Sequence, residues 1–436
     1  MAWIGGAVAL ALLSGCAAPE PSAQPVATPA GTVAVPPRIS DAPARSAFGQ
    51  AVARAVAAHP DLALGAADLR AAQAARRGAE GAFIPDVSIG IGAESSRTGG
   101  VTSSNTSPFL RVSQLVYDAG ASRAGLEAAR ARESQRSADR TGLAAAAALE
   151  AVEVWRGVAD TRRLLALARA NRATLGEIAD RIAARAQSGA GTAADTLTAQ
   201  SRLADADTRI AEAQVAARKA EALFLGLFGQ PPAGLSVVAA PALPADGAEV
   251  ARSPRLIAAT AAVAAAQADL DAARARRSPR VELGATGQRA SGGGSDIGLD
   301  LSLTYSLDTR RDRRAAVEQA EAALSAAQAA RDGLARDISE ALAFVRADRA
   351  GAEARLHAAR RAADSAAEAV AARQEQFATG RSSLVDLLDA QRERLRTQEI
   401  LVAAESDRFL TGYAALALTG DILDAFGITL PDPAAP

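Results

Sequence analysis

Two long stretches of the chain lack proline and carry apolar residues at helical spacing. No proline occurs between residues 109 and 230 or between residues 280 and 430. Because proline breaks helix interiors, these stretches permit very long helices. At a rise of 1.5 Å per residue, a helix of about 65 residues is roughly 100 Å long. The pattern predicts two long and two shorter helices, over 120–187, 193–228, 311–377 and 383–418.

Apolar stripes predict the faces on which these helices pack. Within the first long helix the stripe consists of Leu175, Ile178, Ile182 and Ala186. Within the last helix the repeat has heptad spacing, with Leu384, Leu388, Gln391, Leu395, Gln398 and Val402. Heptad spacing is typical of coiled-coil packing. Because two of these positions are glutamine, we expect a partly polar seam.

Between the helices lie two segments whose apolar residues alternate with small or polar ones. The first has Val87, Ile89 and Ile91, then a polar loop over Ser95 to Ser107, then a return over Leu110 to Tyr117. The second has Val281, Leu283 and Ala285, a glycine-rich turn over 291–295, then Ile297, Leu299, Leu301, Leu303, Tyr305 and Leu307. Each segment predicts a hairpin with strands of about 10 residues, the length that a tilted membrane strand needs. The alternative is a soluble hairpin with one buried face. Four strands with one apolar face cannot close alone, and their open edges invite pairing, which a barrel shared between copies would satisfy.

The elements recur because the chain contains an internal duplication. Pro60 and Pro85 are 25 residues apart, as are Pro254 and Pro279. Further matches follow in the same order: Ala72-Gln73 with Ala266-Gln267, Gly189 with Gly380, Asp195 with Asp386, and Ala199-Gln200 with Ala390-Gln391. We therefore expect two structural repeats, over 46–240 and 241–425, followed by a short tail over 426–436.

The N-terminus has the pattern of a targeting segment. Residues 3–13 are apolar and too short to span a membrane. They lead into Leu13-Ser14-Gly15-Cys16, which resembles a bacterial lipobox, and Cys16 is the one cysteine of the chain. We expect a signal peptide over 1–15, a lipid on Cys16 and a tether over 16–45. The alternative is a free cysteine in an ordinary signal peptide. No Lys or Arg precedes the apolar stretch, which leaves open a start upstream of Met1.

Composition favours a thin helical assembly and gives no sign of catalysis or of nucleic-acid binding. Hydrophobic residues make up 49% of the chain but aromatic residues only 3%, and alanine supplies much of the difference. Alanine has the highest helix propensity and lets helices approach closely. The net charge is -1 without a basic patch, so no nucleic-acid partner is predicted. After the N-terminal segment, no run of about 20 apolar residues predicts a further spanning helix.

Catalytic, metal and cofactor sites are not predicted. The chain has two histidines and one cysteine, without metal-ligand spacing or a plausible Cys/His nucleophile pair. His59 is expected at a helix start and His357 on a solvated helical face. The run Gly292 to Gly294 lacks the Gly-Lys-Ser/Thr of a phosphate-binding loop. The cluster Arg310 to Arg314 fits a solvated helix start, or alternatively contact with lipid or lipopolysaccharide phosphates.

Several motifs resemble those of the TolC-like outer-membrane efflux protein family, over about residues 46 to 420. They are Ala51 to Pro60 followed by Leu62, Phe83-Ile84-Pro85, Val112 to Gly120, and Gly380 to Gln391. The resemblance implies a mainly α fold with a membrane β-barrel, in which three identical chains each give four strands to a twelve-stranded barrel. The long antiparallel helices would form a tunnel through the periplasm. A periplasmic adaptor (membrane fusion) protein and an inner-membrane transporter, either an ABC protein or a proton-driven pump, would engage it. Because Ala17 is not the aspartate of inner-membrane retention, a lipidated chain of this family is expected at the outer membrane.

The same resemblance implies a gate at the periplasmic entrance. Asp386 and Asp389 are three residues apart and therefore share a helical face. They match carboxylates that ring the narrow entrance in the family, with Asp195 equivalent in the first repeat, where Thr198 stands in place of a second aspartate. The alternative is that these aspartates favour the positive helix N-terminus, worth about 0.3–1 kcal/mol each. Adaptor contact is implied for the helix turns, namely Gly189, Gly191, Thr192, Gly380, Arg381, Ser382, Ser383 and Leu384.

An export duct in contact with outer-membrane lipid is therefore the predicted function. A lipid-anchored periplasmic coiled coil without a pore is an alternative, although it leaves the two alternating hairpins unexplained. An envelope hydrolase is another alternative, but it lacks a catalytic constellation. The sequence does not separate drug efflux, metal efflux and type I protein secretion.

Overall fold

The computed structural model of the chain describes residues 40, 42–242, 248–289, 294–305 and 310–431. All of these belong to one compact unit, Ile39–Pro436. The predicted signal peptide, Cys16, most of the predicted tether and the Gly292 to Gly293 run lie outside the described residues.

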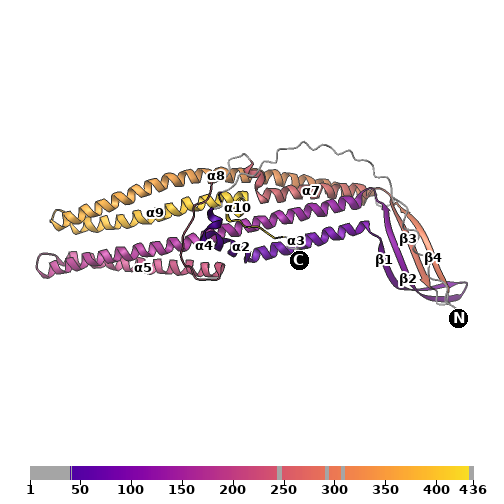
Figure 1. The fold of residues 1–436 in the computed structure, drawn as a ribbon, viewed down its shortest axis with the longest axis horizontal. Coiled ribbons are helices and arrows are strands. Elements are labelled where there is room, and N and C mark those ends of the chain that lie inside the picture. The colour runs from indigo at the N-terminus through magenta and orange to yellow at the C-terminus, as the bar shows by residue number, and fades with distance from the viewer. Residues whose placement is uncertain (1–39, 41, 243–247, 290–293, 306–309, 432–436) are drawn as a thin grey trace. The chain divides into compact units, whose positions relative to one another are not determined.

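The two halves of the chain share one order of main elements, namely a helix, a hairpin, a long helix and a shorter helix (Figure 1). The first half contains α1 (Ala42–Arg45), α2 (Ala47–Ala57), α3 (Pro60–Glu80), η1 (Gly81–Phe83), β1 (Asp86–Thr98), β2 (Val101–Tyr117), α4 (Ala121–Gln187) and α5 (Ala193–Phe228). The second contains α6 (Glu249–Arg252), α7 (Pro254–Ala275), β3 (Arg280–Arg289), β4 (Ser295–Thr304), α8 (Arg310–Ala378), α9 (Leu384–Thr419) and α10 (Ile422–Phe426). The predicted bounds of α4, α5, α8 and α9 are each confirmed to within one residue.

The four strands form one antiparallel sheet in the order β1-β2-β3-β4. The first hairpin differs from its prediction, because the expected polar loop continues both strands. Ser95 lies opposite Ser104, and pairing runs on to Thr98 and Val101. Gly99 and Gly100 then make the turn with φ of 59° and 87°, the left-handed conformation that a two-residue hairpin turn requires. Backbone pairing does not need apolar side chains, so the Ser/Thr-rich segment stays in the ladder.

The helices pack side by side in an order that follows the sheet. Next to the strands, α3 packs on α4, α4 on α7, and α7 on α8. Beyond the middle of the long helices, α5 packs on α4, α4 on α9, and α9 on α8. Figure 1 shows the sheet at one end of these helices and the α4–α5 and α8–α9 turns at the other. Both orders are open rows, with α8 at one end and α3 or α5 at the other.

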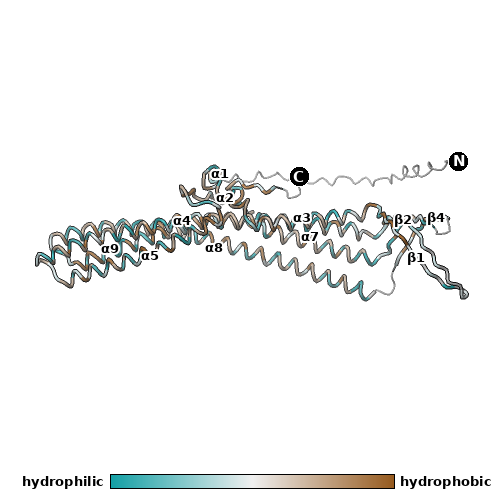
Figure 2. The backbone as a smooth tube through the Cα atoms, turned by 90° about the horizontal axis from the view of Figure 1, so that it is seen from below, coloured by the Kyte–Doolittle hydropathy of each residue, from teal (hydrophilic) through white to brown (hydrophobic). Residues whose placement is uncertain are grey.

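The few aromatic residues are concentrated in one cluster around Phe48. Its ring is fully buried and lies 5.4 Å from Trp155, 6.1 Å from Phe409, 6.0 Å from Tyr413 and 5.5 Å from Phe426, measured between ring centroids. The cluster joins α2, α4, α5, α9 and α10, at the level where Figure 2 shows the short helices α1 and α2 beside α4. Two buried polar groups are satisfied there by the connection after α5. Trp155 Nε1 donates to the Ser236 carbonyl at 3.2 Å, and Tyr413 Oη donates to the Val238 carbonyl at 2.8 Å.

The predicted helical seams are confirmed. Leu175, Ile178 and Ile182 of α4 are buried against Leu384, Leu387 and Leu388 of α9 in one cluster, and Ala186 is half-buried. Gln391, Leu395 and Val402 are buried along the rest of the α9 seam, while Gln398 is half-buried. The hydrophilic and hydrophobic segments that alternate along these helices in Figure 2 are therefore the solvent and packing faces of an alanine-rich coiled coil.

The helix α7 bears on the expectation that no further helix spans a membrane. Within the described residues, α7 is long and apolar enough to cross a membrane by length and hydropathy alone. It instead lies in the helical row between α4 and α8. Ala265, Ala268 and Leu270 are buried in that packing, so the apolar character of α7 is explained by close helix contact.

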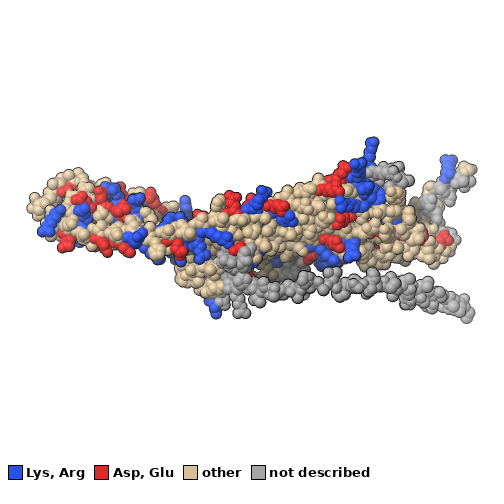
Figure 3. All heavy atoms as spheres, turned by 90° about the horizontal axis from the view of Figure 1, so that it is seen from above, with Lys and Arg blue, Asp and Glu red and all other residues tan. Residues whose placement is uncertain are grey.

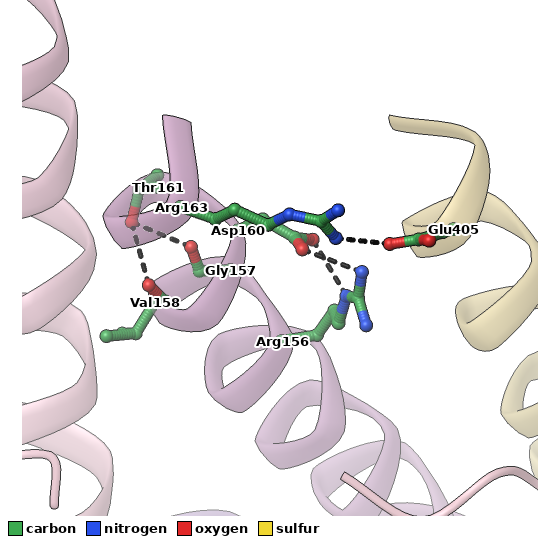
Figure 4. A network of polar contacts seen from close by, with 7 residues as sticks. All are labelled: Arg156, Gly157, Val158, Asp160, Thr161, Arg163 and Glu405. Carbon is green, nitrogen blue, oxygen red and sulfur yellow. Dashed lines mark hydrogen bonds and ion pairs between the residues drawn. The ribbon is translucent and has the colours of Figure 1, made fainter. Parts of the chain in front are cut away.

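Ion pairs are frequent along the helices, most of them exposed and some, such as Arg156 with Asp160, largely buried. Acidic and basic side chains alternate along the face seen in Figure 3. In the close view of Figure 4, Arg156 binds both carboxylate oxygens of Asp160 at 2.9 and 2.8 Å, and Arg163 of α4 pairs with Glu405 of α9. Pairs within a helix add little stability, whereas those between helices also fix their relative level along the bundle.

Phe48→Ala is expected to destabilise the helical body. Removing a fully buried aromatic ring that four other rings contact leaves a cavity, at a cost of about 3–5 kcal/mol. Denaturant unfolding of the purified protein, followed by far-ultraviolet circular dichroism, measures the change. Phe83→Ala is the matched control, because that ring is 49% exposed. Equal midpoints for the two variants would contradict this view of the core.

Candidate functional site

The sheet has one continuous apolar face to which all four strands contribute. In the paired register, Ile89 lies opposite Leu110, and Leu283 lies opposite Leu301. The face consists of Val87, Ile89, Ile91, Leu110, Val112, Val281, Leu283, Ala285, Ile297, Leu299, Leu301 and Leu303, and Gln114 is its polar exception. Ile89 is 85% exposed and Ile297 86%. Such a large exposed apolar surface marks a membrane or protein contact.

The opposite face of the same sheet is mostly polar. It carries Ser88, Arg111, Ser113, Glu282, Thr286, Asp300 and Ser302. Gly284 makes room there for a charged neighbour, because a Cβ at that position would lie 2.5 Å from Asp300 Oδ1. Phe109 and Leu115 are the large apolar exceptions. The ring of Phe109 lies over Gly90, where a Cβ would lie 2.7 Å from Cζ. The sheet thus has one face suited to lipid and one suited to water.

The edges of the sheet are open. β1 and β4 each pair with one neighbour within the described residues, so each presents a row of backbone N–H and C=O groups on its outer side. In water the apolar face would be exposed, and in a bilayer the unpaired backbone groups would cost several kcal/mol each. Neither solvent suits a single copy of this sheet.

At the opposite end of the long helices, the two predicted turns have the same geometry. Gly189 and Gly380 adopt φ of 75° and 72°. In the first turn Ala190 N donates to the Arg185 carbonyl at 2.9 Å, and in the second Arg381 N donates to the Gln376 carbonyl at 2.8 Å. This six-to-one hydrogen bond is the Schellman ending of a helix, for which glycine in the left-handed region is preferred. The duplication therefore extends to the local geometry of the turns.

Asp195 and Asp386 lie in the first turns of the helices that follow, next to the N-caps Thr192 and Ser383. Thr192 Oγ1 accepts from Asp195 N at 3.1 Å and donates to Asp195 Oδ2 at 2.8 Å. Ser383 Oγ accepts from Asp386 N at 3.2 Å, and Ser383 N donates to Asp386 Oδ2 at 3.1 Å, which completes a capping box. Hydrogen bonding with the Ser383 hydroxyl, then with its backbone N–H, holds the pKa of the exposed Asp386 carboxyl below its usual range. Asp386 therefore has the helix-start role that the sequence offered as an alternative, whereas the Asp195 carboxylate accepts from the Thr192 hydroxyl.

Asp389 follows one turn later and is not a cap. Its Oδ1 lies 3.2 Å from a guanidinium nitrogen of Arg392, three residues on, a partner that sequence analysis missed although the spacing of three residues indicates it. The carboxyl side chain is still 47% exposed. Asp386 and Asp389 lie together on the part of α9 that begins at the turn, and they remain accessible to solvent.

Contacts between the repeats bring the two turns together. The guanidinium of Arg185, just before the first turn, lies 5.3 Å from the ring centroid of Phe377, just before the second. Phe377 also packs on the cluster that joins α4 and α9. Thr192, Gly191, Arg381, Ser382 and Leu384 thus belong to one tip formed by both repeats. Sequence analysis did not predict the Arg185–Phe377 contact, because neither residue has a distinguishing local pattern.

The histidines have structural positions. His59 is the N-cap of α3, where Nδ1 accepts from Asp61 N at 3.2 Å, and Nε2 lies 3.4 Å from Glu150. His357 is exposed on α8. No group of three or more His, Cys, Asp or Glu side chains that could hold a metal occurs in the described part of the chain. Arg310 begins α8, as predicted for the arginine cluster.

Comparison with solved structures identifies the architecture. The chain superposes on a crystal structure of CusC, from work on its folding and transmembrane channel formation. The TM-score is 0.80 at 16% identity, with 85% of this chain and 91% of that one covered. It superposes on the outer-membrane channel OprN with a TM-score of 0.78, 23% identity and coverage of 86% and 89%. The outer membrane protein VceC of Vibrio cholerae gives a TM-score of 0.76, 18% identity and coverage of 86% and 96%. At these identities the likeness concerns the fold.

Sequence comparison identifies the family. No curated protein sequence matches the chain. The profile of the outer membrane efflux protein family matches residues 51–230 and 248–418, which together are most of the chain and correspond to its two structural halves. With its paired hairpins, long helices and twin turns, the chain belongs to the outer membrane efflux protein family.

Proposed function

We propose that three copies of this chain form a passive export duct through the outer membrane and the periplasm. The observation that carries the proposal is the sheet, with its apolar face, its polar face and its two open edges. Four strands are too few to enclose a lumen, whereas twelve strands from three copies enclose a water-filled one. The apolar faces would then contact lipid and the polar faces would line the lumen.

The helices support the same assembly. The row α3-α4-α7-α8 continues the strand order, and its ends are as open as the edges of the sheet. Three such rows would close into a tunnel if the last helix of each row packed beside the first helix of the next. A pore-less periplasmic coiled coil would need neither the exposed apolar sheet nor its ladder of paired, alternating residues, so we favour the duct.

The tip of the helices is our candidate for the periplasmic entrance and its gate. Asp386, Asp389 and Asp195 would lie around the threefold axis, where several exposed carboxylates attract cations and repel one another. The capping role of Asp386 fixes its position and keeps it ionised, so capping and gating are compatible roles. The turn residues beside it, including Gly189, Gly380 and Arg381, are our candidate contacts for a periplasmic adaptor that links the duct to an ABC or proton-driven inner-membrane transporter. The exported substrate would be selected by that transporter.

Bilayer recordings test the duct and its gate together. The purified wild-type protein is expected to form cation-selective channels that divalent or trivalent cations block from the helical side. Asp386→Asn with Asp389→Asn is expected to lower both the cation selectivity and the block, because it removes two charges per copy from the entrance. Asp364→Asn with Glu368→Gln removes the same charge from exposed positions further along α8 and serves as the control. Absence of any conductance would refute the duct, whereas unchanged selectivity and block in the first variant would leave Asp386 and Asp389 without a gating role.

Acidity gives a second test of the gate. Because the pKa of Asp386 is lowered chiefly by Ser383, its carboxylate keeps its charge further into the acid range than an ordinary aspartate. Ser383→Ala removes the main cause, so Asp386 should be protonated at a higher pH and cation selectivity should be lost earlier as the pH falls. Ser382→Ala is the matched control, since Ser382 makes a smaller contribution. Identical pH profiles for the two variants would contradict this assignment.

We further propose that Cys16 carries a lipid that anchors the chain to the outer membrane. The proposal rests on Leu13-Ser14-Gly15-Cys16 and on the absence of any other cysteine from the sequence. Cells supplied with labelled palmitate should incorporate the label into the wild-type protein, and Cys16→Ala should abolish it. Because the barrel would itself span the bilayer, part of the variant is still expected in the outer membrane. Continued labelling of Cys16→Ala would disprove the anchor.

A further inference from the structure

Phe344 is an exposed aromatic residue in the middle of α8. Its side chain is 61% exposed, although the neighbouring Ile338 and Leu342 on the other side of the helix are 2% exposed. The residues one turn to either side on the same face are Glu340 and Asp348, both exposed. In the described part of the chain, neither carboxylate is within ion-pair distance of a basic group. This stripe of α8 therefore presents one large apolar side chain between two uncompensated negative charges.

A hollow on α4 and α5 has the complementary character. It has a volume of about 650 Å³ and is lined by Glu150, Val154, Lys219, Ala222, Leu223, Gly226 and Leu227. Leu223 is 66% exposed on its rim. Lys219 is the one lysine of the sequence, and no carboxylate of the described residues pairs with it. Glu150 is the one acidic residue of the lining, and it lies 3.4 Å from His59.

The stripe and the hollow lie at the same level along the helices. Arg163 of α4 pairs with Glu405 of α9, as Figure 4 shows, and Arg408 of α9 lies 3.2 Å from Glu353 of α8. These contacts put Glu353 about one turn nearer to the sheet than Arg163. Phe344 is nine residues nearer to the sheet than Glu353, or about 13 Å at 1.5 Å per residue. α4 runs in the same direction, so Phe344 is level with the stretch between Glu150 and Val154.

The helix order determines which helix of a neighbouring copy faces the hollow. α5 and α8 are the two ends of the row α5-α4-α9-α8. Rotation about an axis along the helices preserves the level of every residue, so α8 of one copy meets α5 of the next with Phe344 opposite the hollow. We propose that Phe344 inserts between α4 and α5 of the neighbouring copy and that Lys219 of that copy pairs with Glu340 or Asp348. The inference rests on the proposed trimer and names the contact that closes it.

Cysteine cross-linking tests the contact. Phe344→Cys combined with Leu223→Cys should give dimers and trimers under oxidation that persist in sodium dodecyl sulfate and disappear on reduction. The control pair is Ala329→Cys with Leu223→Cys, because Ala329 is exposed on α8 but about 22 Å from Phe344 along the helix. That pair should not form a disulfide. Each single variant shows whether an introduced cysteine links to Cys16 instead. The native mass of every variant, measured in mild detergent before oxidation, reports the trimer independently.

The outcomes separate this contact from the trimer itself. A trimeric mass without linkage above the control overturns the contact and leaves the proposed function intact. A link confined to one chain, seen as a monomer of altered mobility, also overturns it. A monomeric mass for the unmodified protein contradicts both proposals.

Charge reversal provides a second readout that leaves Phe344 and the apolar residues of the hollow unchanged. Lys219→Glu places like charges together and should lower the temperature at which the trimer dissociates. Glu340→Lys added to that variant should restore a large part of the loss. The proposed ion pair would be excluded if Lys219→Glu and the wild type dissociated at the same temperature. It would also be excluded if neither Glu340→Lys nor Asp348→Lys, each added to Lys219→Glu, raised the dissociation temperature.

Discussion

The unpaired backbone groups at the two edges of the sheet constrain everything else in this protein. A strand that faces lipid cannot leave its N–H and C=O groups without partners, because no water is present to satisfy them. The edges of β1 and β4 nevertheless border a continuous apolar surface, and exposing that surface to water is unfavourable. The helices repeat the constraint, since the row that follows the strand order is also open at both ends. In the assembly that we propose, further copies would supply partners for the sheet and the helices at once, by one and the same rotation.

The alanine-rich composition follows from this architecture. A row of helices has little interior, so large side chains would hold neighbouring helices apart, whereas alanine lets them approach closely. The aromatic residues are instead gathered around Phe48, where α2, α4, α5, α9 and α10 meet and a compact core is possible. This cluster holds the two repeats together midway between the sheet and the tip.

Sequence patterns predicted the helices and turns well because their causes are local. The proline-free stretches, the heptad seam that includes Leu388 and Leu395, and the glycines at positions 189 and 380 each determine structure within a few residues. The length of β1 and β2 was missed, because Ser95 to Ser107 resembles a loop until Gly99 and Gly100 are seen to form a two-residue turn. Tertiary contacts such as Arg185 with Phe377 could not be predicted, because they depend on how the two repeats pack.

The central claim is that one chain is an incomplete channel and that closure requires three. Native mass measurement of the purified protein in mild detergent, combined with conductance of the same fractions in a planar bilayer, tests it most directly. The account predicts that ion conduction is found only in the fraction with three times the mass of one chain. A stable fraction with the mass of a single chain that still conducts ions would contradict it.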